Sequence, residues 1–119
     1  MATKMTILSI SDDPEKAFPP FMIAAGALAS DMDVMIFFSM SGLNIIKKGG
    51  AEEIVLPNAP MTLTDLINTT KEQGIRLVAC STACPIMGLE KEDLLDGVEM
   101  AGIATFINEA KDSDIVLTF

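Results

Sequence analysis

The chain has 119 residues, of which 50% are hydrophobic and 21% charged, and its formal net charge is −9. This length suits one domain spanning residues 1–119, and the acidic excess argues against a nucleic-acid partner because phosphates would be repelled. The chain contains no histidine, which excludes Ser-His-Asp and Cys-His catalytic sites.

The first predicted elements are a strand over residues 4–10 and a helix from residue 14 to about residue 30. The strand is a short apolar run rich in β-formers that ends at the sequence SDDP. Ser11 or Asp12 is expected to cap the helix, and Pro14 falls in its first turn, where proline is tolerated. Small residues in the run AAGALA favour close packing, so we expect this helix to be buried over much of its circumference.

A nearly continuous apolar run over residues 33–39 predicts a strand that is covered on both faces. A short helix over residues 41–48 is expected to follow it, with Ser41 as the N-cap and Gly49 as the stop. An irregular loop then passes between two prolines over residues 56–60.

The next predicted elements are an amphipathic helix over residues 62–74 and a strand over residues 75–80. Leu63, Leu66 and Ile67 fall on one face of that helix, and a glycine follows its last residue. The strand is a compact apolar run that ends on a cysteine.

The remaining chain predicts a short acidic helix over residues 90–96, a strand over 98–103, a helix over 104–111 and a strand over 114–119. The strands are apolar throughout instead of alternating, and helices separate them, which is typical of a parallel sheet. The sequence therefore predicts an α/β fold with a five-stranded, mainly parallel sheet and helices on both faces.

The two cysteines, Cys80 and Cys84, lie at the end of the strand 75–80 and in the loop after it. Ligands of open parallel sheets bind outside the carboxyl ends of the strands. Backbone N–H groups at such an edge would lower the pKa of a thiol from its free value of about 8.5. Cys80 is therefore the first candidate for a reactive residue, and the alternative is a buried cysteine that only fills space.

The loop around these cysteines carries further candidate residues. Ser81 and Thr82 are small and can donate hydrogen bonds to a bound sulfur species, and Gly88 permits a positive φ. Pro85 favours an extended conformation at Cys84.

Two thiolates without histidine leave a zinc site incomplete, so no metal is expected. No dinucleotide-binding or P-loop motif follows any predicted strand, so we expect no nucleotide cofactor, and none of any other kind is indicated. The chemistry that remains needs little acid–base help, because a thiolate attacks a sulfur atom, holds it and is attacked in turn.

Polar side chains also follow the strand 33–39 at the same edge of the predicted sheet. Ser41, Asn44 and Lys47 could hold an anion such as thiosulfate or sulfite through a hydroxyl, an amide and an ammonium group. The alternative for Lys47 is an ordinary charge near the carboxyl end of a helix.

The sequence resembles the DsrE/DsrF/DsrH-like superfamily over nearly its whole length. The resemblance is strongest in FFSMSGLNIIKK (37–48), in VACSTACPIMGL (78–89) and from EDLLDG to the end (92–119). Relatives carry a cysteine at the strand end, then small or Ser/Met residues, then Met-Gly. The matching residues here are Cys80, Ser81, Met87 and Gly88.

This resemblance implies a flavodoxin-like, three-layer α/β/α fold and a cytoplasmic sulfur carrier or sulfurtransferase-like protein. It implies a homo-oligomer that holds a persulfide or thiosulfonate on Cys80. The partners would be small sulfur species or sulfur-relay proteins, and the protein would act as a carrier more than as a turnover enzyme. Cys84 departs from the family pattern, since relatives more often have Ser-Met or an acidic residue there. It could resolve a Cys80 adduct into a disulfide or carry sulfur itself.

Two alternative functions stay open, a thiol redox protein that cycles a Cys80–Cys84 disulfide and a non-catalytic, oligomeric interaction module. The mean hydropathy of +0.42 is high and favours homo-oligomerisation. No secretory signal is apparent, and Asp31 and Asp33 divide the most apolar stretch into pieces shorter than the ~20 residues of a spanning helix. We therefore expect a cytoplasmic protein without membrane insertion.

Overall fold

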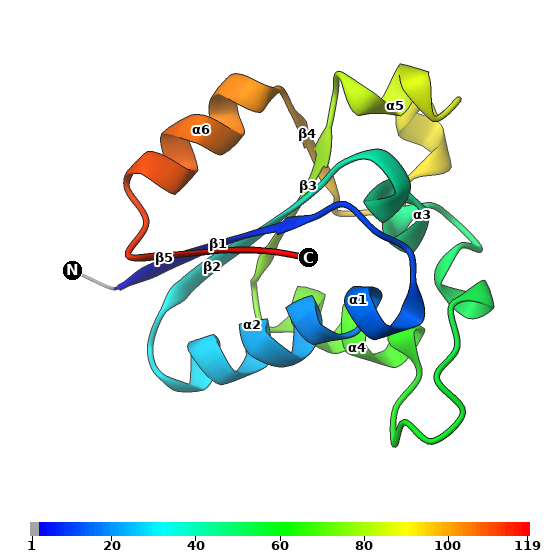
Figure 1. Ribbon diagram of the computed structural model, residues 1–119, viewed down its shortest axis with the longest axis horizontal. Coiled ribbons are helices and arrows are strands. Elements are labelled where there is room, and N and C mark those ends of the chain that lie inside the picture. The colour runs from blue at the N-terminus through cyan, green and yellow to red at the C-terminus, as the bar shows by residue number, and fades with distance from the viewer. Residues whose placement is uncertain (1–2) are drawn as a thin grey trace.

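A single sheet of five parallel strands is the centre of the computed structural model, which describes residues 3–119 (Figure 1). The strands are β1 (Lys4–Ser9), β2 (Asp33–Phe38), β3 (Arg76–Cys80), β4 (Glu99–Ala101) and β5 (Ile115–Thr118). Their order across the sheet is β4-β3-β2-β1-β5. The predicted five-stranded parallel sheet is therefore confirmed.

Helices connect these strands on both faces of the sheet, as predicted. The α-helices are α1 (Pro14–Ala17), α2 (Pro19–Ala29), α3 (Leu43–Ile46), α4 (Leu63–Glu72), α5 (Ala83–Ile86) and α6 (Ile103–Lys111). The 3₁₀ helices are η1 (Met40–Gly42), η2 (Ala51–Glu53) and η3 (Lys91–Asp93). Figure 1 shows α2 and α4 beneath the sheet and α6 above it. Among residues 3–119, the helices are too short or too polar to cross a membrane.

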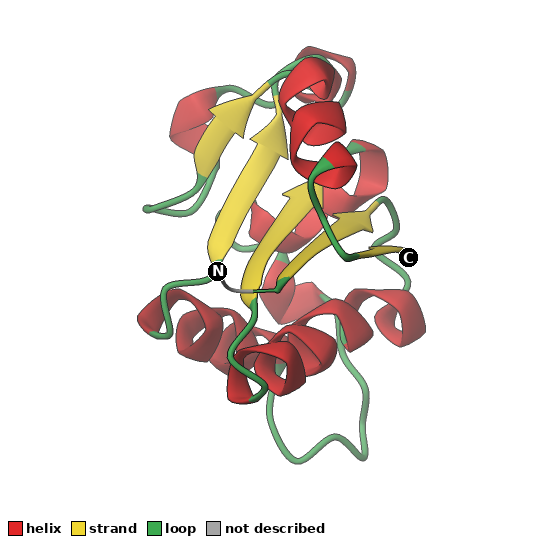
Figure 2. Ribbon diagram, turned by 90° about the vertical axis from the view of Figure 1, so that its left-hand side faces the viewer, coloured by secondary structure: helices red, strands yellow, loops and turns green. Residues whose placement is uncertain are grey.

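The direction of each crossover decides which face of the sheet a helix covers. The chain moves stepwise from β1 to β4 across the sheet and then returns past all of them to β5, beside β1. Crossovers between parallel strands are right-handed, so the reversal of direction places α6 on the face opposite to α2 and α4. Figure 2 shows the resulting helical layers on the two sides of the strands.

The helix predicted from residue 14 to about residue 30 is two helices, α1 and α2, which meet at Phe18. Pro19 follows and has no N–H to donate, so the helical hydrogen bonding is interrupted there. The N-cap of α1 is Asp13, whose carboxylate accepts a hydrogen bond from the Glu15 N–H (3.2 Å). The predicted N-caps, Asp12 and Ser11, therefore lie one and two residues before the observed N-cap.

Only one stripe of α2 is buried, which comprises Pro20, Phe21, Ala24 and Ala27. These positions repeat at intervals of three or four residues and form the face that packs on the sheet. Met22 lies outside the stripe and is 61% exposed. The prediction of a helix buried over much of its circumference was wrong.

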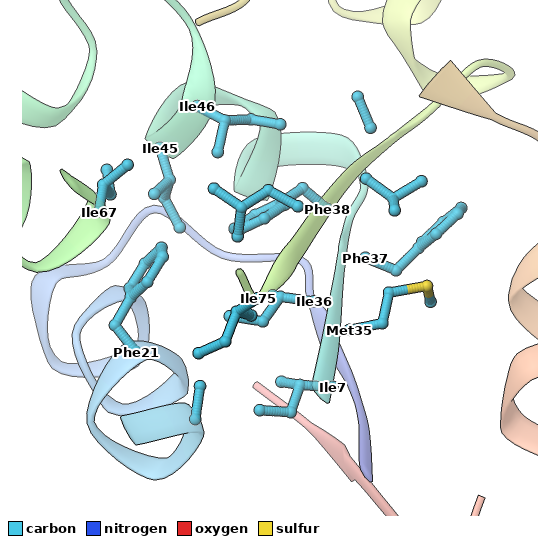
Figure 3. Close-up of a cluster of buried hydrophobic side chains, with 14 of the residues drawn as sticks. Ile7, Phe21, Met35, Ile36, Phe37, Phe38, Ile45, Ile46, Ile67 and Ile75 are labelled. Carbon is cyan, nitrogen blue, oxygen red and sulfur yellow. The ribbon is translucent and has the colours of Figure 1, made fainter. Parts of the chain in front are cut away.

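The hydrophobic core lies on both faces of β2, as the close-up in Figure 3 shows. Phe21 of α2 stacks on Phe38 of β2, with ring centroids 6.0 Å apart. On the other face Phe37 contacts Phe106 of α6, with centroids 5.2 Å apart. All residues of β2 after Asp33 are buried, which confirms the prediction of a strand covered on both sides. Burial of each large apolar side chain contributes about 1.5–3 kcal/mol.

Ion pairs connect β3 with its neighbour β4 and connect α6 with the sheet. Arg76 of β3 donates hydrogen bonds to both carboxylate oxygens of Glu99 in β4 (2.9 and 3.0 Å) and to Glu109 of α6 (3.1 Å). Lys4 of β1 also pairs with Glu109. Arg76 lowers the pKa of Glu99, and Lys4, followed by Arg76, lowers the pKa of Glu109. The ion pairs compensate for the shallow packing of α6, none of whose residues is fully buried.

Substitution of Arg76 by methionine is expected to lower the free energy of unfolding at pH 7 by about 1 kcal/mol, because the pairs are partly exposed. The pKa values of Glu99 and Glu109 are depressed below 4.5 in the folded state, so their stabilisation is complete above that pH and is lost as the pH falls. Urea denaturation of the wild type and Arg76→Met at several pH values measures the free energy of unfolding of each protein.

The difference between the two proteins should therefore shrink as the pH falls below 4.5 and both carboxylates become protonated. Lys16→Met, at an exposed position of α1, is the control and should change stability by less than about 0.5 kcal/mol. A difference for Arg76→Met that is the same at pH 3 and pH 7 would show that it does not arise from the carboxylate pairs.

Candidate functional site

Cys80 is the last residue of β3, and its main chain pairs with Ala101 of β4. Its predicted place at the carboxyl end of the strand is confirmed. Successive side chains of a strand alternate, so Cys80 faces the same side as Arg76, towards the face that carries α6. Only 1% of Cys80 is exposed. The prediction that its sulfur lies at an open rim was therefore wrong.

The short helix α5, which the sequence analysis did not predict, carries Cys84 as its second residue. Pro85 is the third residue, within the first turn, where the missing N–H breaks no helical bond. Cys84 is therefore helical, and the predicted extended conformation was wrong. The sequence signal for α5 is this proline, which is as compatible with a first helical turn as with an extended loop.

Both thiols are buried, and the helix α5 that carries Cys84 packs at the end of the strand that carries Cys80. The helix contacts β3 and η1, and Figure 1 shows it at the carboxyl end of β3. Cys84 is 1% exposed, and its burial raises the pKa of its thiol, with a further rise caused by the charge of Cys80. Burial disfavours the charged thiolate, so Cys84 is a weaker nucleophile than a free cysteine.

Ser81 and Thr82 form an exposed turn between β3 and α5. The Ser81 N–H donates a hydrogen bond to the Ala101 carbonyl (2.9 Å), and the Ser81 side chain lies next to Gly102, the N-cap of α6. Gly102 has no side chain with which to cap the first N–H groups of α6. The turn and the start of α6 therefore bring hydrogen-bond donors to the edge of the sheet where Cys80 lies.

Gly88 and Lys47 line one surface cavity, of about 280 Å³, which neither cysteine lines. Gly88 has φ +70°, so the predicted left-handed backbone is confirmed. The remaining lining residues are Lys48, Leu89, Glu92 and Asp93. Two ammonium groups and two carboxylates leave this cavity without a strong excess of either charge.

Asn44 and Lys47 also line a cavity of about 320 Å³ near the carboxyl end of β1. The Asn44 amide donates a hydrogen bond to the Asp12 carboxylate (2.9 Å). Asp12 is one of three carboxylates in this lining, together with Asp13 and Glu53. Three carboxylates around one ammonium group disfavour a small anion in this cavity.

Ser41 lies in η1, the element that contacts α5, and is half-buried. It does not cap α3 as predicted, since no side chain caps either η1 or α3. The predicted site residues therefore divide into two groups. Those at the α5 edge are Cys80, Cys84, Ser81, Thr82 and Ser41, and those lining the separate cavities are Asn44, Lys47 and Gly88.

Within residues 3–119, no group of three or more Cys, Asp or Glu side chains is placed so that it could hold a metal ion. The α5 edge itself brings together two buried thiols and the neighbouring Ser81–Thr82 turn.

The chain matches the sequence model of the DsrE/DsrF/DrsH-like family over residues 1–59 and 52–118. It belongs to this family. The match confirms the resemblance identified from the residues around Cys80 and in the carboxyl-terminal third.

Individual relatives agree with this assignment. The chain is 34% identical over 113 residues to the uncharacterised protein MK0008 of Methanopyrus kandleri, covering 92% of this chain and 89% of that one. It is 25% identical over 153 aligned positions to the sulfur carrier protein DsrE2 of Allochromatium vinosum, covering 96% of each. The crystal structure of YchN from Escherichia coli superimposes with a TM-score of 0.77 over the whole of both chains, at 19% identity, which confirms the fold.

Both thiols are expected to react slowly with iodoacetamide in the native protein, because α5 must open before the reagent reaches either sulfur. At pH 7 the rate should be at least about tenfold below that of the chain unfolded in urea. Mass spectrometry of quenched samples measures both rates. Equal rates in native and unfolded protein would show that the sulfurs are accessible in the closed structure.

Proposed function

We propose that the protein is a sulfur carrier that accepts sulfur on Cys80 as a persulfide or thiosulfonate. The observation that supports this most directly is the position of Cys80 at the carboxyl end of β3, in a chain that belongs to the DsrE/DsrF/DrsH-like family. The similarity to a protein named as a sulfur carrier adds support over 96% of both chains. Hydrogen-bond donors in the Ser81–Thr82 turn lie at the same edge.

The proposed loading step is a thiol–persulfide exchange. The Cys80 thiolate attacks the outer sulfur of a donor persulfide, the bond between that sulfur and the donor thiol sulfur breaks, and the donor leaves as a thiolate. One sulfur–sulfur bond replaces another, so no external oxidant or reductant is needed. With tetrathionate, the same attack forms a Cys80 thiosulfonate and releases thiosulfate.

Access to Cys80 requires α5 to move away from β3. This helix is only four residues long, and its outer residue Ile86 is 65% exposed. Its closing hydrogen bonds run from Met87 to Ala83 (3.0 Å) and from Leu89 to the Cys84 carbonyl (2.8 Å). Because few buried contacts hold so short a segment, its opening costs less than global unfolding. In this proposal the closed form shields the bound sulfur from solvent.

Incubation with tetrathionate is expected to add one thiosulfonate group to the wild-type protein, detectable by intact-mass measurement. Cys84→Ser should keep this adduct and Cys80→Ser should lose it, because only Cys80 terminates the strand. Circular dichroism of both variants controls for folding. Loss of the adduct in Cys84→Ser with retention in Cys80→Ser would assign the sulfur to the other cysteine.

Burial of both thiols favours a second candidate function, a non-catalytic interaction module. In that case neither cysteine reacts with tetrathionate in the native protein at any time of incubation, although both react after unfolding. The mass measurement above therefore distinguishes the two functions.

We also propose that the protein forms homo-oligomers through the outer surface of α6 and β5. Ile103 and Ile107 lie one turn apart on α6 and are 53% and 55% exposed, and Ile115 and Val116 of the edge strand β5 are 39% and 45% exposed. Large exposed apolar side chains are typical of interfaces, and an unpaired edge strand invites pairing.

The variant Ile107→Glu is expected to shift the mass measured by light scattering towards the monomer, because a carboxylate would be buried in the interface. Met22→Glu, at an exposed position on α2, should leave the mass unchanged. A wild-type protein that is already monomeric would contradict the proposal.

A further inference from the structure

A groove of about 430 Å³ lies between η2, the loop of residues 54–62 and the amino end of α4, and we call it the apolar groove. Phe18, at the junction of α1 and α2, also lines it. Figure 1 shows the loop, in green, extending away from the helices at the lower right. The groove belongs to the side of the sheet covered by α2 and α4, whereas Cys80 faces the side of α6. It is therefore separate from the candidate site.

Large apolar side chains form much of the groove, among them Ile54, Val55, Leu56 and Met61. Val55 is 59% exposed and Met61 is 40% exposed, so the chain itself leaves part of this surface in water. Exposed apolar side chains gathered around a hollow mark binding surfaces more than they mark ordinary solvent-facing positions. A volume of this size accommodates a few side chains of a bound segment.

The charged residues that line the apolar groove are both acidic. Glu52 and Asp65 contribute exposed carboxylates, and no Lys or Arg within residues 3–119 lines the groove. A ligand that fills the groove therefore meets apolar walls and negative charge. Positive charge on the ligand would be attracted both by these carboxylates and by the net charge of −9 on the whole chain.

The two stretches of this chain that match the family model overlap at residues 52–59, which form part of the groove wall. In this chain the groove wall is a short loop, and its apolar side chains stay exposed.

From these observations we infer that the apolar groove binds an apolar segment of another protein that carries Lys or Arg residues. The segment's apolar side chains contact Val55, Met61 and their neighbours, and its cations face Glu52 and Asp65. A second copy of this chain is the less favourable occupant, since 17 acidic residues against 8 basic ones make each copy repel another at an acidic rim. The inference does not depend on sulfur transfer, because groove and cysteines lie on opposite sides of the sheet.

The test uses the full chain and a fluorescein-labelled amphipathic peptide built from leucine and lysine, with binding measured by fluorescence anisotropy. The double variant Val55→Ser/Met61→Ser should weaken binding by at least about tenfold, because two apolar contacts are lost. The matched control Ile10→Ser/Met22→Ser removes two apolar side chains of similar exposure elsewhere (43% and 61%) and should change affinity by less than about twofold. Both pairs are exposed, so folding is preserved, as circular dichroism checks.

The charge of the groove is tested in the same assay. Glu52→Gln should weaken binding of the leucine–lysine peptide by about threefold, whereas Glu72→Gln, on α4 but outside the groove lining, should not. A peptide with glutamate in place of each lysine should not bind measurably.

Three results would overturn the inference. The first is no binding of the leucine–lysine peptide to the wild type, and the second is equal loss in the groove variant and its control. The third is a change in sedimentation of the unliganded protein caused by Val55→Ser/Met61→Ser, which would assign the groove to a second copy of the chain. Tetrathionate labelling of the same variants should be unaffected. A negative binding result therefore leaves the sulfur-carrier proposal untouched, and a negative labelling result leaves the groove proposal untouched.

Discussion

The right-handed crossover between parallel strands is the constraint on which the rest of this structure depends. The strand order sends the chain in one direction from β1 to β4 and then back to β5. With a fixed hand of connection, that single reversal places α6 on the face opposite to α2 and α4. It also decides which side chains of β3 meet which helix, since Arg76 and Cys80 lie on the α6 face and Leu77 and Ala79 on the other.

Two consequences follow for the α6 face. At the amino end of the strands, Arg76 finds Glu99 and Glu109 and is fully engaged as a structural cation, so it is not available to a thiolate at the far end of β3. At the carboxyl end, Cys80 is buried, and the short helix α5 that follows carries a second buried thiol, Cys84. The α6 face thus has ion pairs at the amino end of the strands and the short helix α5 at their carboxyl end.

Burial of a cysteine lowers its reactivity in sulfur exchange. Apolar surroundings disfavour the thiolate, as the raised pKa of Cys84 shows, and exchange reactions need the thiolate. In the proposed function, reactivity therefore depends on the opening of α5. The α2/α4 side holds the apolar groove, which neither cysteine lines.

Much of the fold follows directly from local patterns. The apolar runs at residues 33–39 and 75–80 predicted strands, and the structure has buried strands there, because a strand covered on both faces needs mostly apolar side chains. The alternation of strands and helices predicted the parallel sheet, and the family resemblance was confirmed. One helix was predicted from residue 14 to about residue 30, and Pro85 was expected to keep Cys84 extended. Both predictions were wrong because Pro19 and Pro85 each stand in the first turn of a helix, where proline is tolerated.

Local patterns predicted that Cys80 ends a strand and that Gly88 can adopt a positive φ, since both depend on the residue itself and its neighbours. Long-range packing is the reason that both thiols are buried, that Arg76 pairs with Glu99 and Glu109, and that Asn44 and Lys47 line cavities apart from the cysteines. Burial and ion pairing depend on which distant segments pack together. That choice is made by the strand order and the hand of the crossovers, which no local pattern along the chain encodes.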